Sequence, residues 1–328
     1  MFLACPANSA DQALPSLKVA RLQDRALMLK RARAFFDERQ VLEVDCPILS
    51  VRASVDAHID LIPATYHGQK TAYLHSSPEY GMKRLLAEGM GDIYQLSHVF
   101  RDGEHSFKHN PEFTMAEWYR MGLSLEEMME ETVQFIRLFV GDLPYQVISY
   151  RDLFLQETGL DYYTASEQDL FSYIQANHIP FYASVVEEGK DALLNLILGS
   201  QIEPRLGQDK LCVLAYYPAS QAALARKRWH GQEPVAERFE VYYKGIELAN
   251  GYHELTDAVE QHQRFIEANE QRHSLGKNPL PIDGHFLKAL EKGLPDCCGV
   301  AVGFDRLMML RHPQAQIADV IAWGWDQA

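Results

Sequence analysis

The chain has 328 residues, of which 47% are hydrophobic and 23% charged, and its 31 lysines and arginines against 45 aspartates and glutamates give a net charge of −14. This composition is ordinary for a globular enzyme, and the sequence holds no run of about 18 apolar residues, which excludes a membrane-spanning helix. Because a protein that grips nucleic acid by its phosphates normally has a basic face, RNA and DNA are poor default partners, and a basic protein or a cationic small molecule is a better one.

The N-terminus and the cysteines give a first indication of where the protein works. Residues 1–11 lack the basic region and the long apolar run of a signal peptide. The five cysteines stand singly except for Cys297-Cys298, and no histidine lies at zinc-ligand spacing from any of them. We therefore expect reduced core thiols and a cytoplasmic protein.

The first elements follow from the spacing of apolar residues. Residues 1–16 are expected to form a loose tail, after which helical spacing predicts a helix over 17–39 and a short strand over 41–44. The order Ser77-Pro78-Glu79 supplies a cap, a first-turn proline and an early acid, so a second helix is expected from there to Glu88.

The rest of the chain alternates between strands joined by short loops and helices. Further strands are expected at 92–100, 112–120, 211–216, 239–243 and 246–250, further helices at 124–140, 166–177, 188–200 and after Thr256, and a last helix after 299–306. This order favours an antiparallel sheet flanked by helices over βαβ winding, so the predicted fold class is α+β, in one domain over 17–328.

Three glutamates lie seven residues apart at Glu240, Glu247 and Glu254. With Lys244-Gly245 as a two-residue hairpin turn, residue 242 faces Glu247, and Glu240 then lies diagonally from Glu247 on the same face. Two converging carboxylates repel each other unless a cation lies between them, and Mg²⁺ is the natural candidate. Gly251 can break the strand, so Glu254 need not share the ligand role. The same spacing also fits a solvated strand face with ordinary acids.

The polar loop over residues 101–110 is dense in groups that meet phosphates. Arg101 offers a planar fork and Lys108 a point charge, while Phe113 just beyond could stack on a base. Arg306, in Gly303-Phe304-Asp305-Arg306, is a second basic candidate. Taken alone, the loop also fits an ordinary polar hairpin loop, and Arg306 also fits an ion pair with Asp305 at a helix start.

Four ordered segments resemble the motifs of the lysine-type class II aminoacyl-tRNA synthetases. Phe100-Arg101 with the stretch from His109 to Tyr119 resembles motif 2, and Gly299 to Arg306 resembles motif 3. Val41 to Pro47 resembles motif 1, which forms the dimer interface in that family, and Glu247 to Leu255 resembles the segment before motif 3. The resemblance runs from about residue 17 to the end and implies the class II catalytic fold and a homodimer.

The resemblance implies a site for bent ATP. Phe113 and Arg306 would clamp the adenine and Arg101 would hold the α-phosphate, which makes the two arginines the catalytic residues. Glu240 and Glu247 would hold Mg²⁺. The other implied ATP-binding residues are Asp102, Gly103, Glu104, Lys108, His109, Asn110, Glu247, Leu248 and Gly303.

Acids and a phenol are implied to recognise the amino acid. Glu79, with Ser77 and Pro78, would receive an amino group near the reacting end, and Glu254 with Tyr119 would receive the side-chain ammonium. Ala301 stands where lysyl-tRNA synthetases typically have glycine, so its methyl group could favour a β-amino acid by about 1–3 kcal/mol.

Two departures from the motifs have consequences. Gly103 stands where motif 2 usually has a glutamate, and we expect Glu104 to contact the adenine edge instead. Gln40 stands where motif 1 more often has glycine, which predicts modest strain at the helix end.

Only about 16 residues precede the first predicted helix, so the anticodon-binding barrel of the lysyl-tRNA synthetases is not expected, and neither is tRNA. The chain resembles the elongation factor P lysine ligase family, most specifically at 218–222 and 236–245. The implied reaction uses ATP and Mg²⁺ to activate (R)-β-lysine and joins it to a lysine of elongation factor P. The alternatives are a tRNA-charging enzyme, a non-catalytic regulatory paralogue, and a ligase for another small acceptor.

Overall fold

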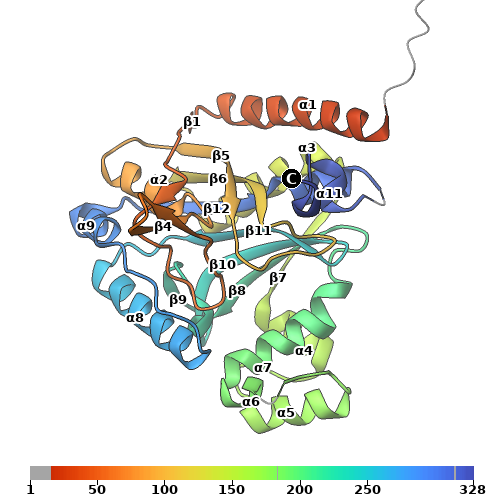
Figure 1. Ribbon diagram of the computed structural model, residues 1–328. Coiled ribbons are helices and arrows are strands. Elements are labelled where there is room, and N and C mark those ends of the chain that lie inside the picture. Colours follow the sequence, from red (N-terminus) through yellow and green to blue (C-terminus); the bar gives the residue numbers. More distant parts are fainter. Residues whose placement is uncertain (1–15, 183, 314) are drawn as a thin grey trace, which may run out of the picture.

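The computed structural model describes residues 16–182, 184–313 and 315–328 (Figure 1). The expected tail over 1–16 and Cys5 therefore lie outside the described residues, apart from Ser16. Within the described ranges, no helix has both the length and the apolar character needed to cross a membrane.

A nine-stranded sheet forms the centre of the molecule. In spatial order its strands are β1 (Leu42–Glu43), β5 (Ile93–Phe100), β6 (Glu112–Met121), β12 (Cys297–Gly303), β11 (Ile246–His253), β10 (Glu233–Tyr243), β8 (Leu211–Pro218) and β7 (Tyr145–Ser149), and β9 (Lys227–His230) pairs with β10. The pairs are antiparallel except at the two edges, where β1 runs parallel to β5 and β7 parallel to β8. The α+β prediction is confirmed, and only the parallel edges differ from it.

A three-stranded sheet and short turns complete the non-helical part. The small sheet has the order β2 (Leu49–Ser50), β4 (Lys70–Leu74) and β3 (Pro63–Tyr66). The short turns are the π-helical Leu198–Ile202 and the 3₁₀ segments Glu203–Arg205, Ala219–Gln221 and Trp325–Gln327.

Alternation along the strands separates the two faces of the large sheet. Residues such as Trp118, Phe239 and Val300 join a core with α1 (Leu17–Asp37), α3 (Leu125–Val140) and α10 (Phe304–Arg311) on one face. Figure 1 shows α1 lying across one side of the sheet, with α3 beneath it and α11 (Ile317–Val320) near its N-terminal end, where Arg21 pairs with Asp319. This face is closed by apolar packing.

Two separate groups of helices cover the opposite face. One group packs around Tyr80 and consists of α2 (Glu79–Ala87), α8 (Ala258–Ser274) and α9 (Gly284–Gly293). The other packs on β8 and β10 and consists of α4 (Tyr150–Thr158), α5 (Glu167–Ala176), α6 (Ser184–Glu187) and α7 (Lys190–Ile197). Figure 1 shows these four as a compact lobe at the end of the molecule away from α1. Polar residues of the central strands face the region between the two groups.

The local predictions hold with small shifts. The helix after residue 16 ends at Asp37 and is followed by Gln40 at φ 58°, which confirms the expected strain at that non-glycine position. Helix α2 has Pro78 as its N-cap, one residue later than expected. Strand β11 runs through Gly251 to His253, so the strand break that Gly251 could introduce does not occur. Glycine is needed there because the Phe239 ring fills the space where a Cβ would lie. The four described cysteines are free and buried.

Candidate functional site

A cavity of about 330 Å³ lies on the polar face of the sheet. Strands β6, β10, β11 and β12, helix α2 and the loop after β5 all contribute to its wall. Its lining includes the predicted site residues Ser77, Glu79, Arg101, Glu104, Lys108, His109, Asn110, Phe113, Tyr119, Glu240, Glu247, Leu248, Glu254, Ala301, Gly303 and Arg306. Pro78, Asp102 and Gly103 are adjacent in sequence but do not line the cavity. The predicted residues therefore converge from elements far apart in the chain.

Arg306 is held by the loop that follows β5. Its Nη2 donates to Nε2 of His109 at 2.8 Å, and its Nη1 donates to the carbonyl of Glu247 at 2.8 Å. Burial and the charge of Arg306 lower the pKa of His109 to about 4, so its ring is neutral. Because Nε2 accepts from Arg306, Nδ1 carries the proton and donates to Ser106 Oγ at 2.8 Å.

Asp305 has other partners than Arg306. It forms an ion pair with Arg25 of α1 and accepts from the backbone of Thr114 at 2.9 Å. The simpler interpretation of Arg306 as the partner of Asp305 is therefore wrong, and the guanidinium of Arg306 lines the cavity instead.

Arg101 is the second cation of this region. Its guanidinium lies 5.2 Å from the centroid of the Phe113 ring and its Nη1 lies 3.6 Å from Glu104. Its Nε is buried and has no hydrogen-bond partner among the described residues. A buried donor of this kind is costly unless it binds an acceptor, and a phosphate oxygen fits it. We call Arg101, Phe113, His109 and Arg306 the arginine group.

Asn110 lies beside this group in a fixed orientation. Its side-chain nitrogen donates to the carbonyl of Glu112 at 2.7 Å, and its oxygen accepts from the backbone of Trp325 at 2.9 Å. The C-terminal segment thus fixes the end of the loop over residues 101–110, which the sequence patterns did not indicate.

Glu240 and Glu247 both face the cavity from the β10–β11 hairpin. Tyr242 pairs with Glu247 as predicted, but a bulge places Val241 opposite Ala249, so Leu248 is an extra residue. Glu240 is bound by Arg238 at 2.5 Å and by the hydroxyls of Tyr217 and Tyr242. The Glu247 carboxylate lies 3.5 Å from Nη1 of Arg306, and its enclosure in the cavity together with the charge of Glu240 raises its pKa.

These two carboxylates fit a metal only together with other ligands. Within the described ranges, no group of three or more histidine, cysteine or acidic side chains could hold an ion by itself. Mg²⁺ is commonly held by one or two carboxylates plus substrate phosphates, and the nearby Arg101 and Arg306 provide for phosphates. The donor set therefore fits Mg²⁺ that arrives with a nucleotide.

Glu203 is a third acid in this region that sequence reasoning missed. Burial, Glu240 and Glu247 raise its pKa to about 7, and it accepts from the hydroxyl of Tyr242 at 3.2 Å. Glu203 lies in a 3₁₀ turn far from the β10–β11 hairpin in sequence, and no local sequence pattern predicts its place in the site.

A second cluster, the acid group, consists of Glu79, Glu117 and Glu254. Glu117 lies on β6 and accepts from Ser77 Oγ at 2.7 Å and from the Tyr119 hydroxyl at 2.8 Å. Burial and Glu79 raise the pKa of Glu117 to about 7. Glu117 was missed, although its position two residues before Tyr119 places both side chains on one face of a strand.

Lys83 joins the other two acids. Its Nζ lies 2.5 Å from Glu79 and 2.6 Å from Glu254, and its side chain is 1% exposed. Burial lowers the pKa of Lys83, but Glu254 and Glu79 together raise it above its usual value, so it stays charged. Burial raises the pKa of Glu254 to about 8 despite this partner. Lys83 was also missed, although it lies one helical turn after Glu79.

The floor under the acid group is built of small residues. In the sheet Gly299 pairs with Tyr119, and Ala301 pairs with Glu117 and with Asn250. A Cβ at Gly299 would overlap the Glu254 carboxylate and the Tyr119 ring. Glycine is therefore needed there to let both side chains reach the cavity.

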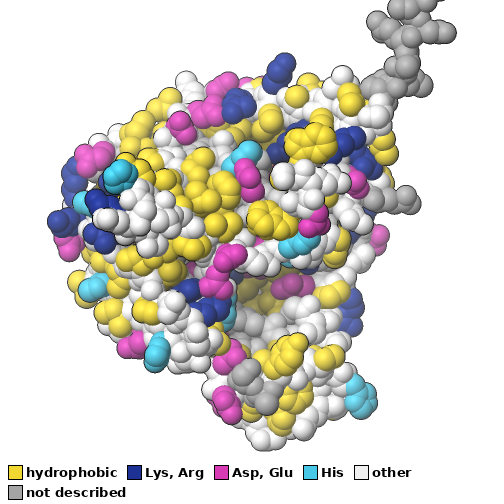
Figure 2. Space-filling model, viewed as in Figure 1, with side chains coloured by type: hydrophobic (Ala, Val, Ile, Leu, Met, Phe, Trp, Pro, Cys, Tyr) yellow, Lys and Arg dark blue, Asp and Glu magenta, His cyan; other side chains and the backbone are white. Residues whose placement is uncertain are grey.

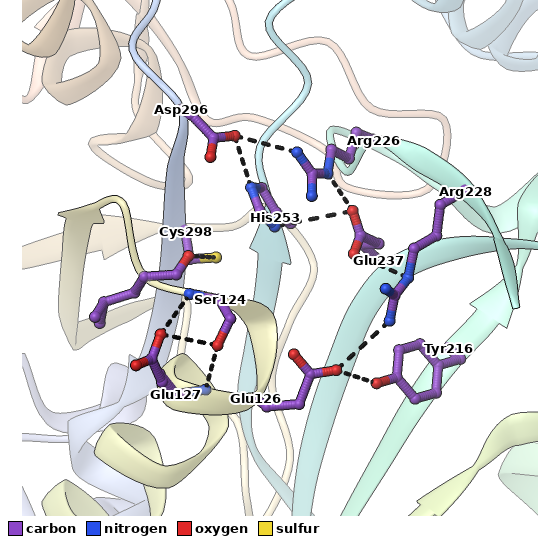
Figure 3. A network of polar contacts seen from close by, with 11 residues as sticks. Ser124, Glu126, Glu127, Tyr216, Arg226, Arg228, Glu237, His253, Asp296 and Cys298 are labelled. Atoms are coloured by element: carbon purple, nitrogen blue, oxygen red, sulfur yellow. Dashed lines mark hydrogen bonds and ion pairs between the residues drawn. The ribbon is translucent and has the colours of Figure 1, made fainter.

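A polar network fixes the end of β11, directly before Glu254 (Figure 3). His253 donates from Nε2 to Asp296 at 2.8 Å, and its other ring nitrogen lies 3.8 Å from Glu237. Arg226 bridges Asp296 and Glu237, and Arg228 continues from Glu237 at 3.0 Å. These contacts hold the backbone that carries Glu254.

The comparisons with known proteins cover the whole of this site. The model of the family described as tRNA synthetases class II (D, K and N) matches residues 16–327. Proteins named elongation factor P--(R)-beta-lysine ligase are 42% identical in Salmonella arizonae, 43% in Pseudoalteromonas translucida and 40% in Haemophilus influenzae, each over 319 residues. Each alignment covers 96% of this chain and 98% of the relative.

Proposed function

Because the chain belongs to the class II tRNA synthetase family, and within it to the elongation factor P--(R)-beta-lysine ligases, we propose that it activates (R)-β-lysine with ATP and joins it to a lysine side chain of elongation factor P. The observation that carries the proposal is that one cavity holds both the arginine group and the acid group. The first suits the phosphates and base of ATP, and the second suits an amino acid with two ammonium groups.

In the first step, a carboxylate oxygen of β-lysine forms a bond to the α-phosphorus of ATP, and the bond to pyrophosphate breaks. Arg101, whose Nε has no hydrogen-bond partner among the described residues, stabilises the charge that develops on the phosphate oxygens. Arg306, aligned by neutral His109, clamps the nucleotide against Phe113. Glu240 and Glu247 would hold Mg²⁺, which supplies further charge neutralisation at the phosphates.

In the second step, the nitrogen of the acceptor lysine bonds to the acyl carbon, the bond to AMP breaks, and the amine loses a proton. The free cysteines Cys297 and Cys298 are not needed as nucleophiles, and burial raises the pKa of both thiols. Direct transfer to the acceptor therefore suits the residues present.

The acidic composition favours a protein acceptor over tRNA. On the face drawn in Figure 2, lysine and arginine side chains are scattered among acidic ones and form no continuous basic patch. Phosphate-directed binding needs such a patch. We expect no efficient tRNA charging.

The proposal includes a homodimer and a cytoplasmic location. Apolar side chains in and after the segment that resembles motif 1 are exposed, namely Leu42 at 52%, Leu49 at 46% and Val51 at 62%. A partner subunit would cover them. Equilibrium sedimentation that gives a monomer at micromolar concentration would contradict the dimer. The free thiols of the described cysteines support a reducing compartment.

Pyrophosphate exchange tests the activation step. The purified protein, ATP and Mg²⁺ are incubated with (R)-β-lysine or with L-α-lysine. Faster exchange with β-lysine is expected, and exchange with α-lysine alone would overturn the proposed substrate.

A further inference from the structure

A buried cation, Lys83, touches the acid group, and no part of the reaction uses it. Lys83 reaches its two carboxylate partners from helix α2, and it does not line the cavity, whereas Glu79 and Glu254 do. Lys83 therefore lies outside the cavity, where it contacts the residues that would bind the substrate but does not contact the substrate itself.

The two acids that Lys83 joins come from different parts of the fold. Glu79 opens α2, and Glu254 follows β11, where it is fixed by its backbone bond to Cys297 at 3.0 Å. The Glu254 side chain is 1% exposed and that of Glu79 is 15% exposed. Without a cation between them, two carboxylates in such a site would repel each other, and at least one would take up a proton.

The charge count of the acid group also depends on Lys83. When all are ionised, the three carboxylates and one ammonium leave two negative charges, which match the two ammonium groups of a diamino acid. The remaining carboxylate, Glu117, is held by Ser77 and Tyr119 rather than by a cation. Removal of Lys83 would change this count and the positions of two of the three acids.

We propose that Lys83 is a positioning residue that holds the Glu79 and Glu254 side chains together at one place in the cavity wall, and thereby makes the site specific for an amino acid with two ammonium groups. This inference rests on the proposed activation of a diamino acid. It assigns the preference for two amines to a residue outside the cavity, not only to the acids that contact the substrate.

The test is Lys83→Met, which keeps the length of the side chain and removes its charge. We expect the KM for β-lysine in pyrophosphate exchange to rise on the order of 100-fold, because the buried acids lose their partner. The KM for ATP should stay within about threefold, since the arginine group makes no contact with Lys83. The preference for β-lysine over its analogue without the side-chain amine should also fall, and Lys83→Arg should restore part of it.

Arg120→Met is a matched control. Arg120 also bridges two acids, Asp92 at 3.0 Å and Glu131 at 2.8 Å, but it lies outside the cavity lining. The Arg120→Met substitution should lower the melting temperature of the protein without changing its preference for an amino acid with two amines. If Lys83→Met raises the KM values for ATP and β-lysine in parallel, or leaves the preference unchanged, the inference is overturned.

The outcomes separate the inference from the proposed function. Pyrophosphate exchange by the wild type with β-lysine tests the proposed function. The ratio of the KM values of the Lys83→Met variant and the wild type tests the role of Lys83. If the wild type prefers α-lysine, the same ratio is measured with α-lysine, so the substrate can be wrong while Lys83 keeps its role. If Lys83→Met does not fold, the same comparison of KM values is made with Lys83→Arg, for which smaller changes are expected. Calorimetric titration with the diamino acid then gives the ratio of affinities without turnover.

Discussion

Arg306 at the start of α10 donates a hydrogen bond to neutral His109 at 2.8 Å, across 197 positions of the chain. This contact joins the two segments that resemble motifs 2 and 3. Histidine is suited to this role because its lowered pKa lets it accept from the guanidinium instead of repelling it.

Replacement of His109 should therefore weaken ATP binding. In His109→Ala, Arg306 loses an acceptor, and we expect the KM for ATP to rise about tenfold, in line with the loss of a hydrogen bond to a charged group. His105→Ala is the control, because His105 lies in the same loop, its side chain is 49% exposed, and its ion partner is Asp326 rather than Arg306. Equal effects of the two changes on ATP-dependent exchange would contradict the assigned role.

A methyl group at position 299 should impair amino-acid binding. In Gly299→Ala, the new Cβ overlaps Glu254 and the Tyr119 ring, so both must move. We expect kcat/KM for the amino acid to fall on the order of 100-fold through this misplacement, with little change in the KM for ATP. Gly199→Ala is the control, because a Cβ there meets open space. Unchanged kinetics in Gly299→Ala would show that the acid group is placed differently.

Binding of the diamino acid should depend on pH in a defined direction. Burial raises the pKa of Glu117 to about 7 and that of Glu254 to about 8, so without the substrate both carboxyl groups are partly protonated near neutrality. Ammonium groups bind the ionised forms, so affinity should rise from pH 6 to about pH 8 and protons should be released on binding. Calorimetry in buffers of different ionisation enthalpy measures this release. A flat affinity profile would be inconsistent with these pKa values.

The same shifts have a consequence for stability. The pKa values of Glu117 and Glu254 are raised above the usual carboxyl value of 4.5, so the folded protein binds more protons than the unfolded chain between that value and about pH 8. The contribution of these groups to the free energy of unfolding should thus be lost as pH rises through this window. Added diamino acid should offset the loss, which melting curves with and without it would measure.

The metal requirement should respond to both hairpin acids. Glu247→Gln and Glu240→Gln each remove a charged ligand, so half-maximal exchange should need at least about tenfold more Mg²⁺. Glu112→Gln, which changes an acid that is 51% exposed and pairs with His98, should leave the requirement unaltered. A normal Mg²⁺ dependence in both hairpin variants would remove these residues from the metal site.

Much of the fold could be predicted because its local signals agree. The hairpin turn at Lys244-Gly245 set the register in which Tyr242 faces Glu247, and the structure confirms it. The resemblance that rested on four ordered motifs is confirmed as well. The bulge at Leu248 could not be predicted, since it depends on pairing with strands from other parts of the chain.

The site residues that the sequence analysis missed were missed for one physical reason. Lys83 and Glu117 look like ordinary charged residues in sequence, and only tertiary burial turns them into parts of a charge cluster. Glu203 likewise meets Glu240 and Glu247 only after the α4–α7 lobe has packed on β10. Local patterns predict elements and faces, whereas these contacts depend on how distant elements pack.

The central claim is transfer of β-lysine to a protein. The most direct measurement is intact mass spectrometry of elongation factor P after incubation with this protein, ATP, Mg²⁺ and (R)-β-lysine. We predict a mass increase of one β-lysyl group on a single lysine, which disappears when Arg101→Ala replaces the wild type. Pyrophosphate exchange with β-lysine but an unchanged mass of elongation factor P would contradict the account.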